Sequence, residues 1–147
     1  MEASTKHPMT RTAAGTVMLI EALTFWTGAL LHLSTPIPLG FTLIAEPQII
    51  PATIVEGLAG LVLALGAYVV FIGRNWARPA ATIAHIFSIA GVLLGITALV
   101  LSFVPRTELN TVYHWTILTF LVIVLIWLLT AGGKAALGRG NPVAGHR

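Results

Sequence analysis

Five ionisable residues stand inside long apolar stretches of this sequence. They are two glutamates and three histidines, namely Glu21, His32, Glu56, His85 and His114. An ionisable group in a lipid environment is costly, so it usually faces the protein interior and marks a binding or proton-transfer site. Imidazole binds transition metals and haem iron, and one carboxylate with two imidazoles suits iron, zinc or manganese. These residue types indicate metal chemistry or proton chemistry.

Two of these residues share one face of a predicted helix. Glu21 and His32 are eleven positions apart, and at 100° per residue this spacing returns to within about 20° of the same direction. Gly28 lies on that face one turn before His32 and leaves space beside it. We expect this face to point into a helical bundle, because charged groups avoid lipid.

The composition is that of a membrane protein. Of the 147 residues, 56% are hydrophobic and 9% are charged, and the mean hydropathy is +0.91. A soluble domain carries about a quarter charged residues, so this chain lacks the polar surface needed to face water on all sides. The length fits one domain and leaves no room for a separate soluble enzyme.

Four stretches are long and apolar enough to span a bilayer, whose core of ~30 Å needs about 20 helical residues. Short connections predict antiparallel neighbours, and Gly91 and Gly95 form a GxxxG pair that permits close helix approach. The fold class is therefore all-α, an integral membrane four-helix bundle with up-down-up-down topology. The predicted spans are 13–33, 51–73, 79–104 and 111–131, with mobile tails at 1–12 and 132–147.

Basic residues predict the orientation of these spans. Seven of the eight Lys and Arg residues flank the spans on one side, and only Arg106 lies on the other. This bias predicts that both termini are cytoplasmic and that the protein resides in the cell's inner membrane. The net charge of +3 is explained by these flanking residues, so we expect lipid and not nucleic acid as the partner.

The orientation sorts the five ionisable residues by depth. His32, Glu56 and His114 lie on three different spans, roughly 9 to 13 Å to the outer side of the helix centres. Glu21 and His85 lie deeper, on the inner half. The sequence thus predicts an outer triplet that binds a metal and an inner polar pair that carries a proton or supplies a second ligand set.

Two cofactors fit the outer residues. One is a transition-metal ion (iron, zinc or manganese) held by His32, Glu56 and His114. The other is a b-type haem with His32 and His114 as axial ligands, against which Trp26 and Trp115 are available to pack. Cysteine is absent, which excludes thiolate metal sites, iron–sulfur clusters and the paired-cysteine chemistry of the vitamin K epoxide reductase type.

Structural explanations of the same residues stay open. His114 lies between two aromatic residues, a pattern typical of an interfacial anchor. Glu56 is near the start of its helix, where water and the positive end of the helix dipole favour a carboxylate. A hydrogen bond between Glu21 and His85 that only holds helices together fits the sequence as well. Glu46, in the proline-rich outer loop, is expected to be solvated.

Part of the second span resembles a known family. The segment Val55-Glu-Gly-Leu-Ala-Gly-Leu-Val-Leu-Ala-Leu-Gly66 resembles the glutamate- and glycine-bearing helix of DoxX-like small four-helix membrane proteins, and the length and number of spans match too. The first span lacks the basic residue expected near its outer end in that group. The resemblance implies a redox-associated membrane protein and transfers no residue roles.

Three hypotheses of function follow. The favoured one is a redox or metal protein, because three histidines lie in three different spans. The second is a proton-coupled transporter centred on Glu21; small multidrug transporters resemble this chain in carrying a glutamate within the first of four helices, although its basic-residue asymmetry opposes that role. The third is a structural or accessory subunit, as a homo-oligomer or within a larger membrane complex. Soluble-enzyme motifs are absent, and the sequence leaves catalytic residues and enzymatic activity open.

Overall fold

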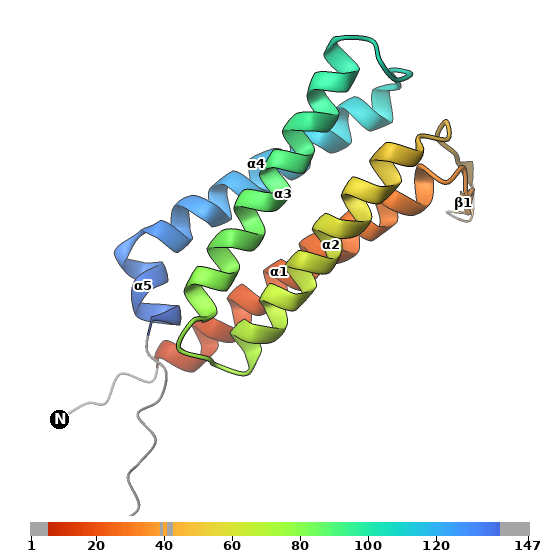
Figure 1. The fold of residues 1–147 in the computed structure, drawn as a ribbon. Helices are drawn as coiled ribbons and strands as arrows, with labels where there is room; N and C mark the ends of the chain where they lie inside the picture. Colours follow the sequence, from red (N-terminus) through yellow and green to blue (C-terminus); the bar gives the residue numbers. More distant parts are fainter. Residues whose placement is uncertain (1–5, 39, 41–42, 139–147) are drawn as a thin grey trace, which may run out of the picture.

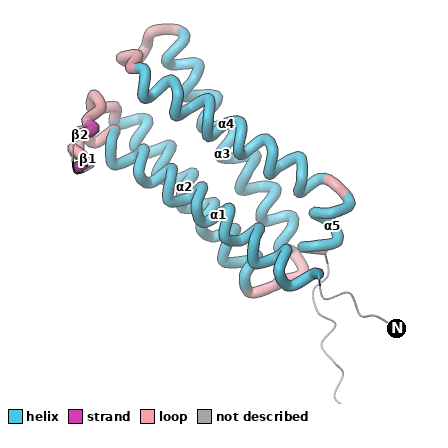
Figure 2. The backbone as a smooth tube through the Cα atoms, turned by 180° about the vertical axis from the view of Figure 1, so that it is seen from behind, coloured by secondary structure: helices cyan, strands magenta, loops and turns pink. Residues whose placement is uncertain are grey.

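The computed structural model describes residues 6–38, 40 and 43–138. Within this part the chain is helical apart from one short hairpin (Figure 1). Its five helices are α1 (Lys6–Leu31), α2 (Ile50–Phe71), α3 (Ala77–Val100), α4 (Glu108–Leu129) and α5 (Ala131–Leu137). The hairpin pairs β1 (Ile37–Pro38) with β2 (Leu43–Ile44) in antiparallel register, within the connection from α1 to α2 (Figure 2).

Four helices are long and apolar enough to cross a membrane, judged by length and composition. They comprise residues Arg11–Leu31 of α1 and the whole of α2, α3 and α4. The all-helical class and the four candidate spans predicted from the sequence are thereby confirmed. The helix ends differ by a few residues from the prediction; α3, for example, ends at Val100 rather than at 104.

Local sequence explains where the long helices begin and end. A proline stands in the first turn of α2, where a missing N–H costs nothing. Thr107 caps α4, because its hydroxyl accepts a hydrogen bond from the Asn110 N–H at 3.1 Å. The chain leaves α1, α2 and α3 through left-handed residues, Ser34, Gly73 and Ser102, a conformation that ends helices by satisfying their last carbonyls.

Each long helix packs against the next one along the chain, and the connections lie alternately at the two ends of the bundle (Figure 1). Small residues at the α1–α2 contact, such as Ala22 and Ala59, are fully buried and allow close approach. Larger side chains, including Met18, Phe25 and Leu63, fill the space between them. The result is a bundle in which α1 contacts mainly α2, whereas α4 contacts mainly α3.

The structure shows helix in parts of the two segments predicted as mobile tails. Residues 131–137, predicted as part of a mobile tail, form α5, which buries Leu137 and Ala136 against the bundle. The Thr130 hydroxyl caps this helix by accepting from the Gly133 N–H. At the other end, α1 begins at Lys6 rather than at 13. Residues 1–5 and 139–147 lie outside the described residues, so the prediction for them is not tested.

Candidate functional site

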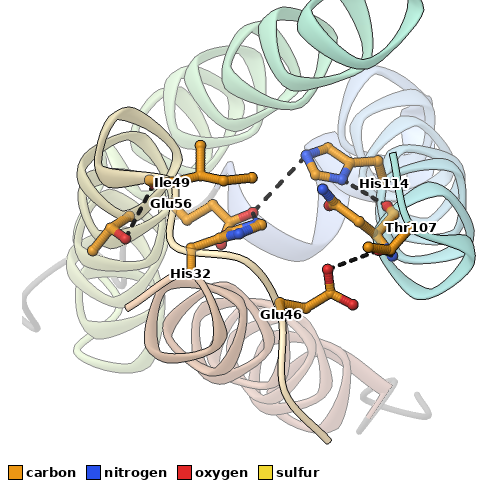
Figure 3. A network of polar contacts seen from close by, with 8 residues as sticks. His32, Glu46, Ile49, Glu56, Thr107 and His114 are labelled. Carbon is orange, nitrogen blue, oxygen red and sulfur yellow. Dashed lines mark hydrogen bonds and ion pairs between the residues drawn. The ribbon is translucent and has the colours of Figure 1, made fainter. Parts of the chain in front are cut away.

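The outer triplet assembles from three elements at one end of the bundle. His32 directly follows α1, Glu56 lies in the second turn of α2, and His114 lies in the second turn of α4. One oxygen of Glu56, Oε1, is 3.6 Å from His32 Nε2 and 3.9 Å from His114 Nε2. Figure 3 shows this arrangement, with the carboxylate between the two imidazoles. The structure thus brings together the three residues that the sequence placed at a common depth.

All three side chains of the triplet are buried. His32, Glu56 and His114 are 2%, 4% and 5% exposed. Among the described residues, neither oxygen of Glu56 has a hydrogen-bond partner. A buried carboxylate without hydrogen bonds is costly and calls for a compensating positive charge. The two imidazoles are the groups close enough to supply that charge or to share it with a bound cation.

A backbone contact orients the imidazole of His114, whereas His32 Nδ1 has no hydrogen-bond partner among the described residues. The Nδ1–H of His114 donates to the Asn110 carbonyl at 2.8 Å, which leaves Nε2 as the atom that faces the carboxylate. A histidine that binds a metal commonly donates its other N–H to such an acceptor. His32 is held through its own carbonyl, which accepts from the Ile49 N–H at 2.9 Å and joins the end of α1 to the start of α2.

Two glycines make room for the triplet. A Cβ on Gly28 of α1 would lie 2.5 Å from Glu56 Oε2 and 2.7 Å from the Tyr113 hydroxyl. A Cβ on Gly95 of α3 would collide with His114 Nε2. Side chains do not approach other atoms this closely, so a larger residue at either glycine would push the triplet apart. The space predicted beside His32 from Gly28 is occupied by Glu56 of α2.

The rim of the site contains a residue for which the sequence prediction was wrong. Glu46 was expected to be solvated, but it is only 8% exposed and accepts a hydrogen bond from the Thr107 hydroxyl at 2.7 Å. The hairpin connection folds over the bundle end and carries Glu46 inward, toward the N-terminus of α4. The loop composition gave no signal of this, because it depends on a contact between segments far apart in the chain.

His32 follows the last residue of α1 and lies outside the four candidate spans. Burial lowers the pKa of its imidazole, but the nearby carboxylates of Glu56 and Glu46 raise it, and the net shift is upward from the ordinary value. The carboxylates therefore favour a positive charge at this corner of the site.

Two small cavities adjoin the triplet. One of about 90 Å³ is lined by residues that include His32, Glu56 and His114, and a second of about 210 Å³ is lined by His32, Glu46, Asn110 and Tyr113, among others. Each has room for a few water molecules or a hydrated ion, at about 30 Å³ per water. Neither Asn110 nor Tyr113 was predicted as a site residue, because an isolated amide or phenol at a span boundary is common; the sequence indicated Asn110 as the N-cap of α4, a place that Thr107 takes instead.

The aromatic residues considered for a flat cofactor lie elsewhere. Trp26 donates from Nε1 to the Gly57 carbonyl at 3.3 Å, and Trp115 is 56% exposed. Neither lines the two cavities beside the triplet. In the part of the chain that the structure describes, no group of three or more His, Asp or Glu side chains already has the spacing of a metal site.

The inner pair forms separately, across the bundle from α1 to α3. Glu21 Oε2 lies 3.2 Å from His85 Nε2, and both residues are buried, at 4% and 0% exposure. The Nδ1–H of His85 donates to the Ala81 carbonyl at 2.7 Å. Nε2 therefore faces the carboxyl group, although neither Nε2 nor the two Glu21 oxygens have a hydrogen-bond partner among the described residues.

The fold and these sites together define an all-helical protein with four candidate membrane spans and buried His/Glu clusters. Comparisons with protein-family models, with curated proteins and with solved structures give no match. The chemistry of the clusters is therefore the basis for assigning a function.

Proposed function

We propose that this chain is an integral protein of the cell's inner membrane that binds one transition-metal ion through His32, Glu56 and His114 for a redox role. Four apolar helices support the membrane location. Seven of eight basic residues flank the spans on one side, which supports cytoplasmic termini and an outward-facing metal site.

One observation carries the proposal: two imidazole Nε2 atoms approach the same Glu56 oxygen, which lacks a hydrogen-bond partner among the described residues. Protein nitrogen and oxygen ligands lie about 2.0–2.2 Å from zinc, so two donors on one tetrahedral ion are about 3.4 Å apart. The separations of 3.6 and 3.9 Å are slightly longer than this. A bound ion would draw the imidazoles inward by a few tenths of an ångström and neutralise the buried carboxylate.

The space beside the triplet favours an ion over haem. The cavity that His32, Glu56 and His114 line together measures about 90 Å³, far less than a porphyrin ring occupies. Both imidazoles that haem would need on its opposite faces approach the same Glu56 oxygen, at 3.6 and 3.9 Å, which leaves no room for a ring between them. Two histidines and one carboxylate form the ligand set of mononuclear iron sites with open coordination positions.

Open coordination positions on iron or manganese, which change oxidation state, would give the site a redox role, whereas zinc would not. Three protein ligands leave room for water or a small substrate, and Asn110 Oδ1 and the Tyr113 hydroxyl are buried without partners within the described part of the chain. Both groups border the adjoining cavity of about 210 Å³, where they are placed to orient a molecule bound to the metal. The resemblance of the second span to DoxX-like proteins supports a redox setting.

Metal analysis of the purified protein tests the proposal. We expect one iron, manganese or zinc per chain after reconstitution and desalting, no Soret band, and loss of the metal in His32→Ala and in His114→Ala. His85→Gln, a histidine replacement in the inner pair, is the matched control and should keep the metal. Metal-free wild-type protein, or equal metal loss in all three variants, would contradict the proposal. A Soret band would show that the protein binds haem rather than a single metal ion.

A further inference from the structure

A groove runs along the outside of the bundle between α1 and α4, the two helices that pack mainly against other neighbours. Its central part measures about 710 Å³, and Val17 and Val124 continue it into a hollow of about 400 Å³ that reaches Trp127. At its outer end the central part borders the cavity of about 210 Å³ beside the outer triplet, with which it shares Thr24 and Leu109. We refer to the hollows of about 710 and 400 Å³ as the α1–α4 groove.

The groove is long and largely apolar. Along α4 it extends from Leu109 to Trp127, which at ~1.5 Å per residue is about 27 Å, close to the ~30 Å of a bilayer core. Its central walls include Ile20, Val112 and Phe120. Because both flanking helices are candidate spans, the groove opens to lipid. A long, flexible apolar chain matches its length and lining.

One buried polar group interrupts this apolar wall. Glu21 lines the central part of the groove yet is only 4% exposed. Its Oε2 lies 3.2 Å from His85 Nε2, and neither Oε1 nor Oε2 has a hydrogen-bond partner among the described residues. Because Oε2 is the oxygen that faces His85, Oε1 is the acceptor left for a bound molecule. An uncharged hydroxyl donor enters this apolar wall at a lower desolvation cost than a cation does.

We propose that the α1–α4 groove binds a neutral lipid-soluble molecule that carries a hydroxyl group on a long apolar chain, such as an isoprenoid alcohol. The chain lies along α4, and the hydroxyl donates to Glu21 Oε1. Without such a donor this oxygen stays desolvated and unpaired, which is costly. This inference concerns the inner pair and does not depend on metal binding at the outer triplet.

Equilibrium binding of radiolabelled geranylgeraniol to the protein in nanodiscs tests the proposal. We expect saturable binding of one molecule per chain. The methyl ether of the same alcohol has the same chain but no donor, and loss of one buried hydrogen bond should weaken its binding about tenfold. Equal affinity for the alcohol and the ether would overturn the assignment of Glu21 as the acceptor.

A pair of threonines on α4 supplies matched variants. Thr116 lines the groove, whereas Thr119, three residues further on, is exposed and donates to the Trp115 carbonyl. Thr116→Trp should fill the groove and abolish binding, and Thr119→Trp should bind as the wild type does, with both folds checked by circular dichroism. Undiminished binding by Thr116→Trp would overturn the proposal.

Two other occupants of the groove would also overturn it. If a second copy of the chain covered the groove, Ile20→Cys would form disulfide-linked dimers in the cysteine-free background. If an ordinary phospholipid filled it, nanodisc phospholipid would be retained through detergent extraction and would not be displaced by geranylgeraniol. We expect monomers in the first experiment and displacement in the second.

Discussion

The outer triplet and the inner pair use the same residue types and differ in how many imidazoles face each carboxyl group. In the inner pair, Glu21 meets one imidazole at 3.2 Å. In the outer triplet, Glu56 faces two imidazoles at 3.6 and 3.9 Å beside a cavity. The second imidazole and the adjoining space are the reasons why we propose a metal ion for the outer triplet and not for the inner pair.

The largest effect is expected from breaking the inner pair. His85→Leu leaves Glu21 buried without its partner, which should lower the free energy of unfolding by about 3–5 kcal/mol. The double variant Glu21→Leu with His85→Leu should recover most of this loss, because no polar group is then left alone. Unfolding in mixed micelles measures both. A double variant no more stable than His85→Leu would mean that the pair is not an isolated unit.

Replacing each glutamate by glutamine tests whether only the outer triplet binds the metal. Glu56→Gln takes away the carboxylate that both outer imidazoles face, and we expect metal affinity to fall about 100-fold or more, beyond the effect of losing a supporting residue. Glu21→Gln makes the same change in the inner pair and should leave metal affinity within about twofold. Competition with a chelator measures the affinities. Similar losses in the two variants would remove the distinction between the clusters.

Glycine substitutions test how tightly the outer triplet is enclosed. Gly28→Ala places a methyl group against Glu56 and Tyr113, so overpacking should cost about 1–3 kcal/mol of stability. Gly57 lies in α2 next to Glu56 but has open space at its Cβ position. Gly57→Ala should therefore be neutral or stabilise the helix by up to about 1 kcal/mol. Thermal unfolding compares the two, and equal effects would indicate a loosely packed site.

The smallest expected effect concerns the rim. Thr107→Val removes the cap of α4 and the hydrogen bond to Glu46, at a cost of about 1 kcal/mol. Thr97→Val on α3 removes a hydroxyl that only bonds to the Leu93 carbonyl of its own helix, and it should be nearly neutral. If the rim supports the outer triplet alone, Thr107→Val should weaken metal binding and leave geranylgeraniol binding unchanged.

The sequence predicted the four long helices and the grouping of the five ionisable residues into an outer triplet and an inner pair. Span length, hydrophobicity and helical periodicity depend on local sequence, so the facing of Glu21 and His32 into the bundle followed from their spacing. The burial of Glu46 and the α1–α4 groove were not predictable, because they depend on how distant segments meet. The helix α5 was missed because Gly132 and Gly133 favour a flexible tail, although Thr130 caps that helix.

The contact between Glu21 of α1 and His85 of α3 has a consequence for biogenesis. A membrane chain that inserts helix by helix delivers Glu21 to the bilayer well before His85 is synthesised. During that interval α1 carries a carboxyl group without its partner, which keeps the helix from settling in open lipid. For the membrane location proposed above, we therefore expect ordered insertion, in which α1 stays beside the insertion machinery until α3 is synthesised.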